Sequence, residues 1–129
     1  APVILAWTTG SRHYVRLAAN LVRSLEFNAP ALMAHFLLVA LGSRAFSALH
    51  RTLRGTLTPL LVSEWGDVWS VRWRLLLTAL CCNVSVVVLD ADMAVLRDFI
   101  PHLTSIPLQA VLGVGSDLLA PERDLWKPW

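Results

Sequence analysis

The sequence predicts an α/β domain with a mostly parallel sheet covered by helices on both faces. Short runs of continuous apolar residues alternate along the chain with segments whose apolar residues recur at helical spacing. The 129 residues are 56% hydrophobic and 16% charged, which allows one buried core and excludes an intrinsically disordered chain. A net charge of +2 gives no reason to expect a nucleic-acid partner. We expect a single Rossmann-like domain over residues 1–129.

The first half of the chain predicts two strands, each followed by a helix. Residues 2–7 are a short apolar run, and Ser11 is placed to cap the helix that follows. The apolar positions of that helix have helical spacing: Tyr14, Leu17, Ala18, Leu21, Val22 and Leu25. Residues 28–30 end it, and the apolar run 31–42, with 35–41 at its centre, predicts a second buried strand. A short helix around Phe46, Leu49 and Leu53 ends at Gly55.

The second half continues the alternation. Residues 57–62 predict a weaker strand, and residues 68–82 a helix that ends in two adjacent cysteines, which we expect to be buried. The expected buried face of this helix contains Trp69, Trp73, Leu76, Leu77 and Leu80. Residues 85–90 give the strongest strand prediction. After them we expect a short helix over 94–99, a stop at Pro101 and a last strand over 108–114.

Three polar turns follow predicted strands. They are Thr8-Thr9-Gly10, Asp90-Ala91-Asp92 and Gly115-Ser116-Asp117. Open parallel sheets bind their ligands at the carboxyl ends of the strands. This position makes the three turns candidates for a binding site.

Asp90 and Asp92 are the strongest candidates for chemistry. Two carboxylates this close repel each other, and a divalent cation such as Mn²⁺ or Mg²⁺ would offset the repulsion. One alternative is an ordinary solvated turn at a strand end. Another is a phosphatase in which Asp90 is the nucleophile; such sites usually have Thr or Ser where Ala94 stands here.

The segment WSVRWRLLLTALCCNVSVVVLDADMAVLRD, residues 69–98, resembles the nucleotide-diphospho-sugar transferases of plants and algae. This family includes xylosyltransferases and arabinosyltransferases of cell-wall and glycoprotein glycans. The resemblance rests on a helix with a basic residue, a turn, a hydrophobic strand, Asp-x-Asp and a later Arg-Asp. Two upstream segments are also similar: YVRLAANLVRSLEF, residues 14–27, with its mid-helix Asn20, and FLLVALGSRAFSAL, residues 36–49.

The resemblance implies the nucleotide-sugar-binding half of a GT-A fold, and a glycosyltransferase that needs Mn²⁺ or Mg²⁺. The donor would be a nucleoside-diphosphate sugar, expected to be a UDP-sugar. The acceptor would be a glycan or glycoprotein hydroxyl, and the family favours retention of configuration. Asp92 would be the main metal ligand, and Asp90 would contact the ribose or, through water, the metal. The residues implied in nucleotide-sugar binding are Thr8, Thr9, Gly10, Arg74, Asp90, Ala91 and Asp92, and Asp117 would contact substrate.

The chain also departs from the family. Met93-Ala94-Val95 and Phe99 stand where a Trp and a Pro are common, Gly42 stands where an Asp is common, and Arg74 where a Lys is common. No acceptor-binding half follows the motif, so we expect 1–129 to be a partial domain. A truncated, non-catalytic nucleotide-binding or interaction module is therefore an alternative.

The family implies a location in the Golgi lumen. Any membrane anchor would lie outside this chain, because no uninterrupted apolar run is long enough to span a bilayer. Asn83-Val84-Ser85 is an N-glycosylation sequon and would fit a luminal protein.

Overall fold

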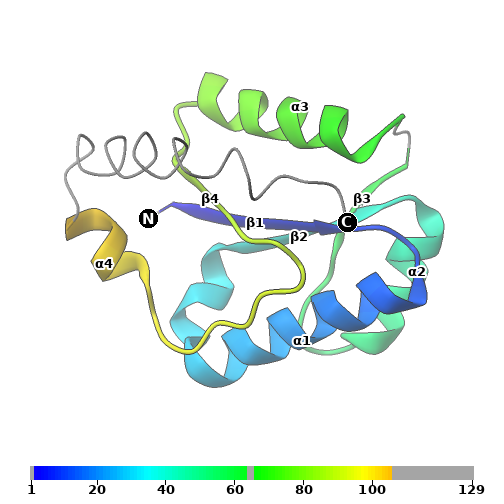
Figure 1. The fold of residues 1–129 in the computed structure, drawn as a ribbon, viewed down its shortest axis with the longest axis horizontal. Helices are drawn as coiled ribbons and strands as arrows, with labels where there is room; N and C mark the ends of the chain where they lie inside the picture. Colours follow the sequence, from blue (N-terminus) through cyan, green and yellow to red (C-terminus); the bar gives the residue numbers. More distant parts are fainter. Residues whose placement is uncertain (1, 64–65, 106–129) are drawn as a thin grey trace, which may run out of the picture. The chain divides into compact units, whose positions relative to one another are not determined.

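The computed structural model describes residues 2–63 and 66–105. The chain divides into two compact units, Ala1–Asp98 and Phe99–Trp129 (Figure 1). The first unit contains the sheet and the candidate site. In the second, the described element is α4, Ile100–Ser105.

A parallel sheet of four strands forms the centre of the first unit. The strands are β1 (Val3–Thr8), β2 (Phe36–Leu41), β3 (Leu60–Val62) and β4 (Val86–Val88), in the spatial order β3-β2-β1-β4. All three pairings are parallel. The order is that of the first four strands of a Rossmann sheet, and it confirms the predicted α/β, Rossmann-like fold.

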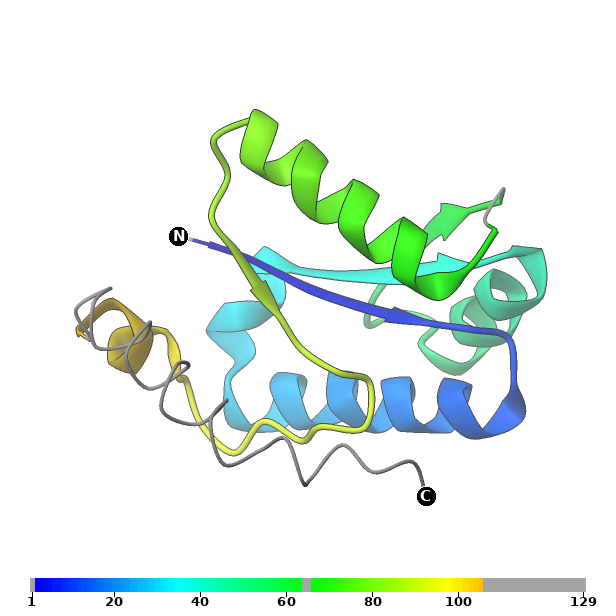
Figure 2. The same cartoon turned by 45° about the horizontal axis from the view of Figure 1, so that its top comes forward.

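Helices cover both faces of this sheet (Figure 2). α1 (Arg12–Asn28) and α2 (Ser43–Thr52) contact each other on one face, and α3 (Val68–Cys81) lies on the other. Right-handed crossovers explain this arrangement. The chain moves in one direction from β1 to β3, which puts α1 and α2 on the same face. It then returns past β1 to β4, so α3 must cross the opposite face.

Alternation along the strands gives each face its own core. Leu5 of β1, with Val39 and Leu41 of β2, packs beneath α3 around Val71. The intervening side chains, among them Ile4 and Leu38, are fully buried on the α1–α2 face. The helices contribute four of the largest fully buried side chains: Leu21, Val22, Leu25 and Leu49.

The predicted buried face of α3 is wrong at four of its five positions, whereas Leu76 is partly buried and packs against the core. Trp69, Trp73, Leu77 and Leu80 are between 58% and 66% exposed, and Val71 is the buried residue of this helix. Apolar residues occupy almost every side of α3, so the pattern does not identify the side that meets the sheet. Both cysteines at its end are also exposed, contrary to expectation. Within 2–63 and 66–105, no helix has the length and apolarity that crossing a membrane requires.

Three further local predictions need correction. Residues 31–35 belong to a 3₁₀ helix, η1 (Pro30–His35), rather than to the second strand. Residues 94–99 form no helix. Pro101 lies in the first turn of α4 instead of marking a stop, which proline allows because first-turn N–H groups have no helical acceptor. The predicted strand 108–114 lies outside the described residues.

Asp67 caps α3 and should make stability depend on pH. Its side chain accepts hydrogen bonds from the hydroxyl and backbone N–H of Ser70, and these bonds lower the pKa of Asp67 below its ordinary 3.8. The stabilisation is therefore fully present above pH 3.8 and is lost as the pH falls through the lowered pKa. Asp67→Asn keeps a capping acceptor that does not titrate. We expect the difference in Tm between the two proteins to shrink below pH 3.8; a constant difference in melts across this range would contradict the assignment.

Candidate functional site

The carboxyl ends of β1 and β4 form the site. These strands are neighbours in the sheet, but the connection that follows β1 and the connection that leads to β4 run in opposite directions across the sheet. α1 and α3, which belong to these connections, therefore lie on opposite faces. Such a reversal opens a crevice in doubly wound folds. A pocket of about 310 Å³ lies here, and its lining combines three segments of the first unit. The lining residues are Trp7, Thr8, Thr9, Tyr14, Val68, Asp90, Ala91 and Asp92.

A tight turn presents the two aspartates. The ladder with β1 continues to Leu89, whose N–H donates to the carbonyl of Leu5 at 2.9 Å. The N–H of Met93 then donates to the carbonyl of Asp90 at 3.1 Å, which closes a β-turn. Asp90 is its first residue and Asp92 its third. Both are exposed, and neither carboxylate has a hydrogen-bond or ion-pair partner among the described residues.

Two threonines at the end of β1 line the same pocket as these carboxylates. Thr8 is 3% exposed, and its hydroxyl donates to the carbonyl of Thr9 at 3.3 Å. Thr9 is half-buried. A hydroxyl oxygen retains lone pairs when its hydrogen is donated, so the Thr8 side chain can still accept a hydrogen bond from a ligand.

Two aromatic residues that sequence reasoning did not select complete the pocket. Tyr14, at the start of α1, is 51% exposed instead of buried. Trp7 is held by Arg72 of α3, whose guanidinium carbon lies 4.9 Å from the Trp7 ring centroid and 5.4 Å from that of Trp69. These are cation–π distances. The alternation of β1 could have identified Trp7, because its side chain points to the α3 face.

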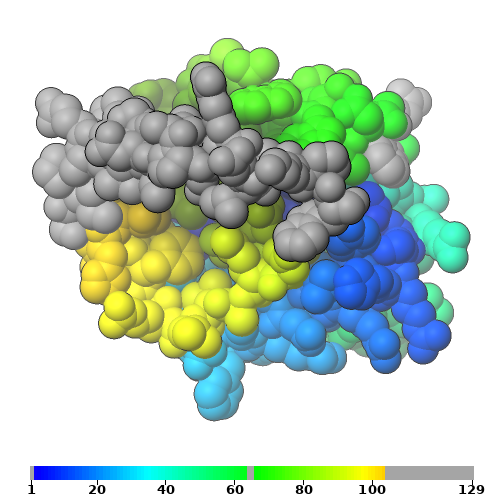
Figure 3. All heavy atoms as spheres, viewed as in Figure 1, coloured from blue at the N-terminus to red at the C-terminus, as the bar shows by residue number. Residues whose placement is uncertain are grey.

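A segment after the turn ties the aspartates to α1. The N–H of Val95 donates to the Ser24 hydroxyl at 2.9 Å, and the Asn28 amide donates to the Val95 carbonyl at 2.8 Å. The Ser24 hydroxyl in turn donates to the Leu21 carbonyl at 2.7 Å. Val95 itself is buried. Residues 93–98, drawn in yellow, run beside α1 in Figure 2, and the yellow and blue atoms of the two segments lie side by side in Figure 3. The position of the turn therefore depends on α1 as well as on β4.

The structure brings five of the predicted site residues together: Thr8, Thr9, Asp90, Ala91 and Asp92. Gly10 lines a different cavity, between α1 and α2. A Cβ at Gly10 would come within 3.1 Å of the Ala45 backbone nitrogen. Arg74 does not line the pocket; it is exposed on α3, where its charge helps to lower the pKa of Asp67. Asp117 lies outside the described residues.

Gly42 has a backbone conformation that explains why glycine stands at this position. Its φ of 91° and ψ of 159° occupy a region that is essentially restricted to glycine. Its N–H donates to the Val62 carbonyl at 2.8 Å and ties the start of α2 to β3. An Asp at this position would need a different backbone path.

The donors in the pocket suit a hard divalent cation. Asp90 and Asp92 offer exposed carboxylate oxygens, the ligands that Mg²⁺ and Mn²⁺ prefer. No group of three His, Cys, Asp or Glu side chains that could hold a metal occurs within the described ranges. One or two carboxylates are enough for Mg²⁺ when water and ligand phosphates complete its shell.

Comparisons of this chain with models of protein families, with curated proteins and with solved structures find no match.

Proposed function

We propose that residues 1–98 form the nucleotide-sugar-binding part of a metal-dependent, GT-A-type glycosyltransferase. One observation carries the proposal. Thr8 and Thr9, at the end of β1, and Asp90 to Asp92, in the turn after β4, line one pocket at the point where the crossovers of a Rossmann-order sheet reverse. Hydroxyls, paired carboxylates and aromatic rings are what a nucleoside diphosphate with a divalent cation would contact.

Each part of the pocket has a role in this proposal. Asp92 would bind Mn²⁺ or Mg²⁺, and Asp90 would contact the cation through water or the ribose hydroxyls. Trp7 and Tyr14 offer ring surfaces for the base, with UDP the expected nucleotide. The cation, when bound, would neutralise charge on the diphosphate. A glycan or glycoprotein hydroxyl would accept the sugar, with retention.

The same proposal places the protein in the Golgi lumen. Asn83 is exposed, with a φ of 55° that asparagine tolerates, so the sequon's side chain is accessible for glycosylation. A loss of mass on N-glycosidase treatment of the protein expressed in a secretory host would support a luminal environment, and an unmodified Asn83 would count against it.

The test of function is calorimetric titration with UDP in the presence of Mn²⁺ and, separately, of EDTA. We expect Mn²⁺ to tighten UDP binding at least about tenfold, equivalent to about 1.4 kcal/mol. Equal affinity in both buffers, or no binding, would refute the metal–nucleotide site. Metal-dependent binding without transfer from UDP-sugars to any glycan acceptor would assign nucleotide binding alone. A trapped phosphoryl group on Asp90 would instead favour phosphatase chemistry.

A further inference from the structure

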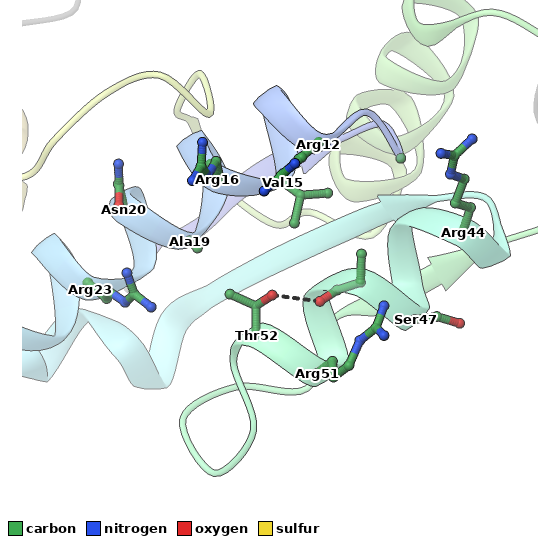
Figure 4. A pocket seen from close by; sticks show the side chains of 12 residues that line it. Arg12, Val15, Arg16, Ala19, Asn20, Arg23, Arg44, Ser47, Arg51 and Thr52 are labelled. Carbon is green, nitrogen blue, oxygen red and sulfur yellow. Dashed lines mark hydrogen bonds between the residues drawn. The ribbon is translucent and has the colours of Figure 1, made fainter.

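A second cavity lies between α1 and α2, on the face of the sheet opposite α3. Its volume is about 880 Å³, larger than that of the pocket beside the aspartates. Five arginines line it, three from α1 and two from α2 (Figure 4): Arg12, Arg16, Arg23, Arg44 and Arg51. We call this cavity the arginine groove.

The arginine groove has no acidic side chain in its described lining. None of the described residues that line it carries a carboxylate, and none of the five guanidinium groups forms an ion pair among the described residues. Residues 10–55 contain six arginines and one glutamate, a net charge of +5, whereas the whole chain carries +2. The rest of the chain therefore has a net charge of −3. The excess positive charge is confined to the segment that builds the groove.

The dimensions of the groove fit a chain-like ligand. Arg12 and Arg23 are eleven positions apart on α1, a separation of about 16 Å along the helix axis. The small side chains of Ala19 and Ala48 lie between the charged residues and leave the groove open. Arginine binds oxyanions through two parallel hydrogen bonds. A linear molecule with repeated sulfate or carboxylate groups would match arginines spaced along the groove in this way.

The neutral residues of the groove favour one class of polyanion as its ligand. Asn20, Ser47 and Thr52 place an amide and two hydroxyls among the arginines, and such groups hydrogen-bond to sugar hydroxyls. The Thr52 hydroxyl donates to the Ala48 carbonyl at 2.8 Å, which leaves its oxygen free to accept (Figure 4). No aromatic ring occurs among the described lining residues, so the groove has no platform for nucleic-acid bases.

We propose that the arginine groove binds an acidic polysaccharide, with sulfate or carboxylate groups on the arginines and sugar hydroxyls on the neutral side chains. The groove lies outside the aspartate pocket, and the inference does not depend on nucleotide binding. A protein without metal-dependent UDP binding could still bind such a chain, and the reverse also holds.

The test compares two double variants that each remove two exposed positive charges. Arg23→Gln with Arg51→Gln removes one arginine from each wall of the groove; Arg54→Gln with Arg97→Gln removes arginines that do not line it. The probe is a size-defined heparin oligosaccharide, and thermal melts check that both variants fold. We expect the groove variant to lose at least about tenfold in affinity and the control less than about twofold. Equal losses would show attraction to net charge alone and overturn the proposal.

Two further probes identify the chemistry. Inorganic polyphosphate and single-stranded oligothymidine, matched to heparin in charge, should bind more weakly than heparin. Polyphosphate binding as tightly would show that the sugar hydroxyls contribute nothing. Oligothymidine binding as tightly would point to nucleic acid. Either result would refute a polysaccharide site.

Discussion

Asp92→Asn is expected to abolish the gain in UDP affinity that Mn²⁺ provides. The substitution keeps the size of the side chain but removes the charge that attracts the cation, and Asp92 has no other partner among the described residues that would need that charge. We expect UDP affinity in Mn²⁺ to fall by the whole of that gain, at least about tenfold or about 1.4 kcal/mol, while affinity in EDTA stays the same. Calorimetric titration of UDP with and without Mn²⁺ measures both values.

Asp67→Asn is the matched control for this variant. Asp67 is also exposed and changes by the same charge, but it caps α3 and does not line the pocket. We expect it to bind UDP and Mn²⁺ as the parent protein does. If both variants lose affinity equally, the effect comes from net charge and Asp92 has no special role. If neither does, the cation binds elsewhere.

The backbone pattern of the fold was predictable because it follows from local signals. Continuous apolar strands and helical spacing give the β-α alternation, and right-handed crossovers then determine which helix lies on which face. The exposed face of α3 was not predictable in this way. Trp69 and Trp73 are as apolar as the α3 residues that contact the sheet. Only the way α3 packs on the sheet makes these two residues exposed and Val71 buried.

The candidate site also combines residues that the sequence predicts with residues that it does not. Thr8, Thr9, Asp90 and Asp92 could be selected because each follows an apolar strand, and parallel strands end at one edge. Arg74 was chosen by its place in the sequence, yet Arg72, two positions earlier, reaches Trp7 beside the pocket. A difference of two positions places residues on different sides of a helix. The arginine groove depends on the contact of α1 with α2, which no local pattern reports.

The anchor between the aspartate turn and α1 provides the second large expected effect. Val95 lies three residues after Asp92, and both of its backbone groups bond to α1 side chains, Ser24 and Asn28. In the variant Ser24→Ala with Asn28→Ala, a partly buried N–H and a partly buried carbonyl lose their partners. We expect about 2–3 kcal/mol loss in the free energy of unfolding, measured in urea, since each unsatisfied group costs about 1 kcal/mol or more.

The anchored segment also limits where the carboxylates can lie, so the same variant should bind UDP with Mn²⁺ more weakly, by about tenfold at a temperature where it is folded. Thr78→Ala is the control. The Thr78 hydroxyl donates to the Arg74 carbonyl within α3, as the Ser24 hydroxyl donates to the Leu21 carbonyl within α1, but Thr78 is exposed and makes no bond to the segment after the turn. This variant should change the free energy of unfolding by less than about 0.5 kcal/mol and should leave UDP affinity with Mn²⁺ unchanged. If the double variant is destabilised but binds at full strength, β4 and its turn position Asp90 and Asp92 without help from α1.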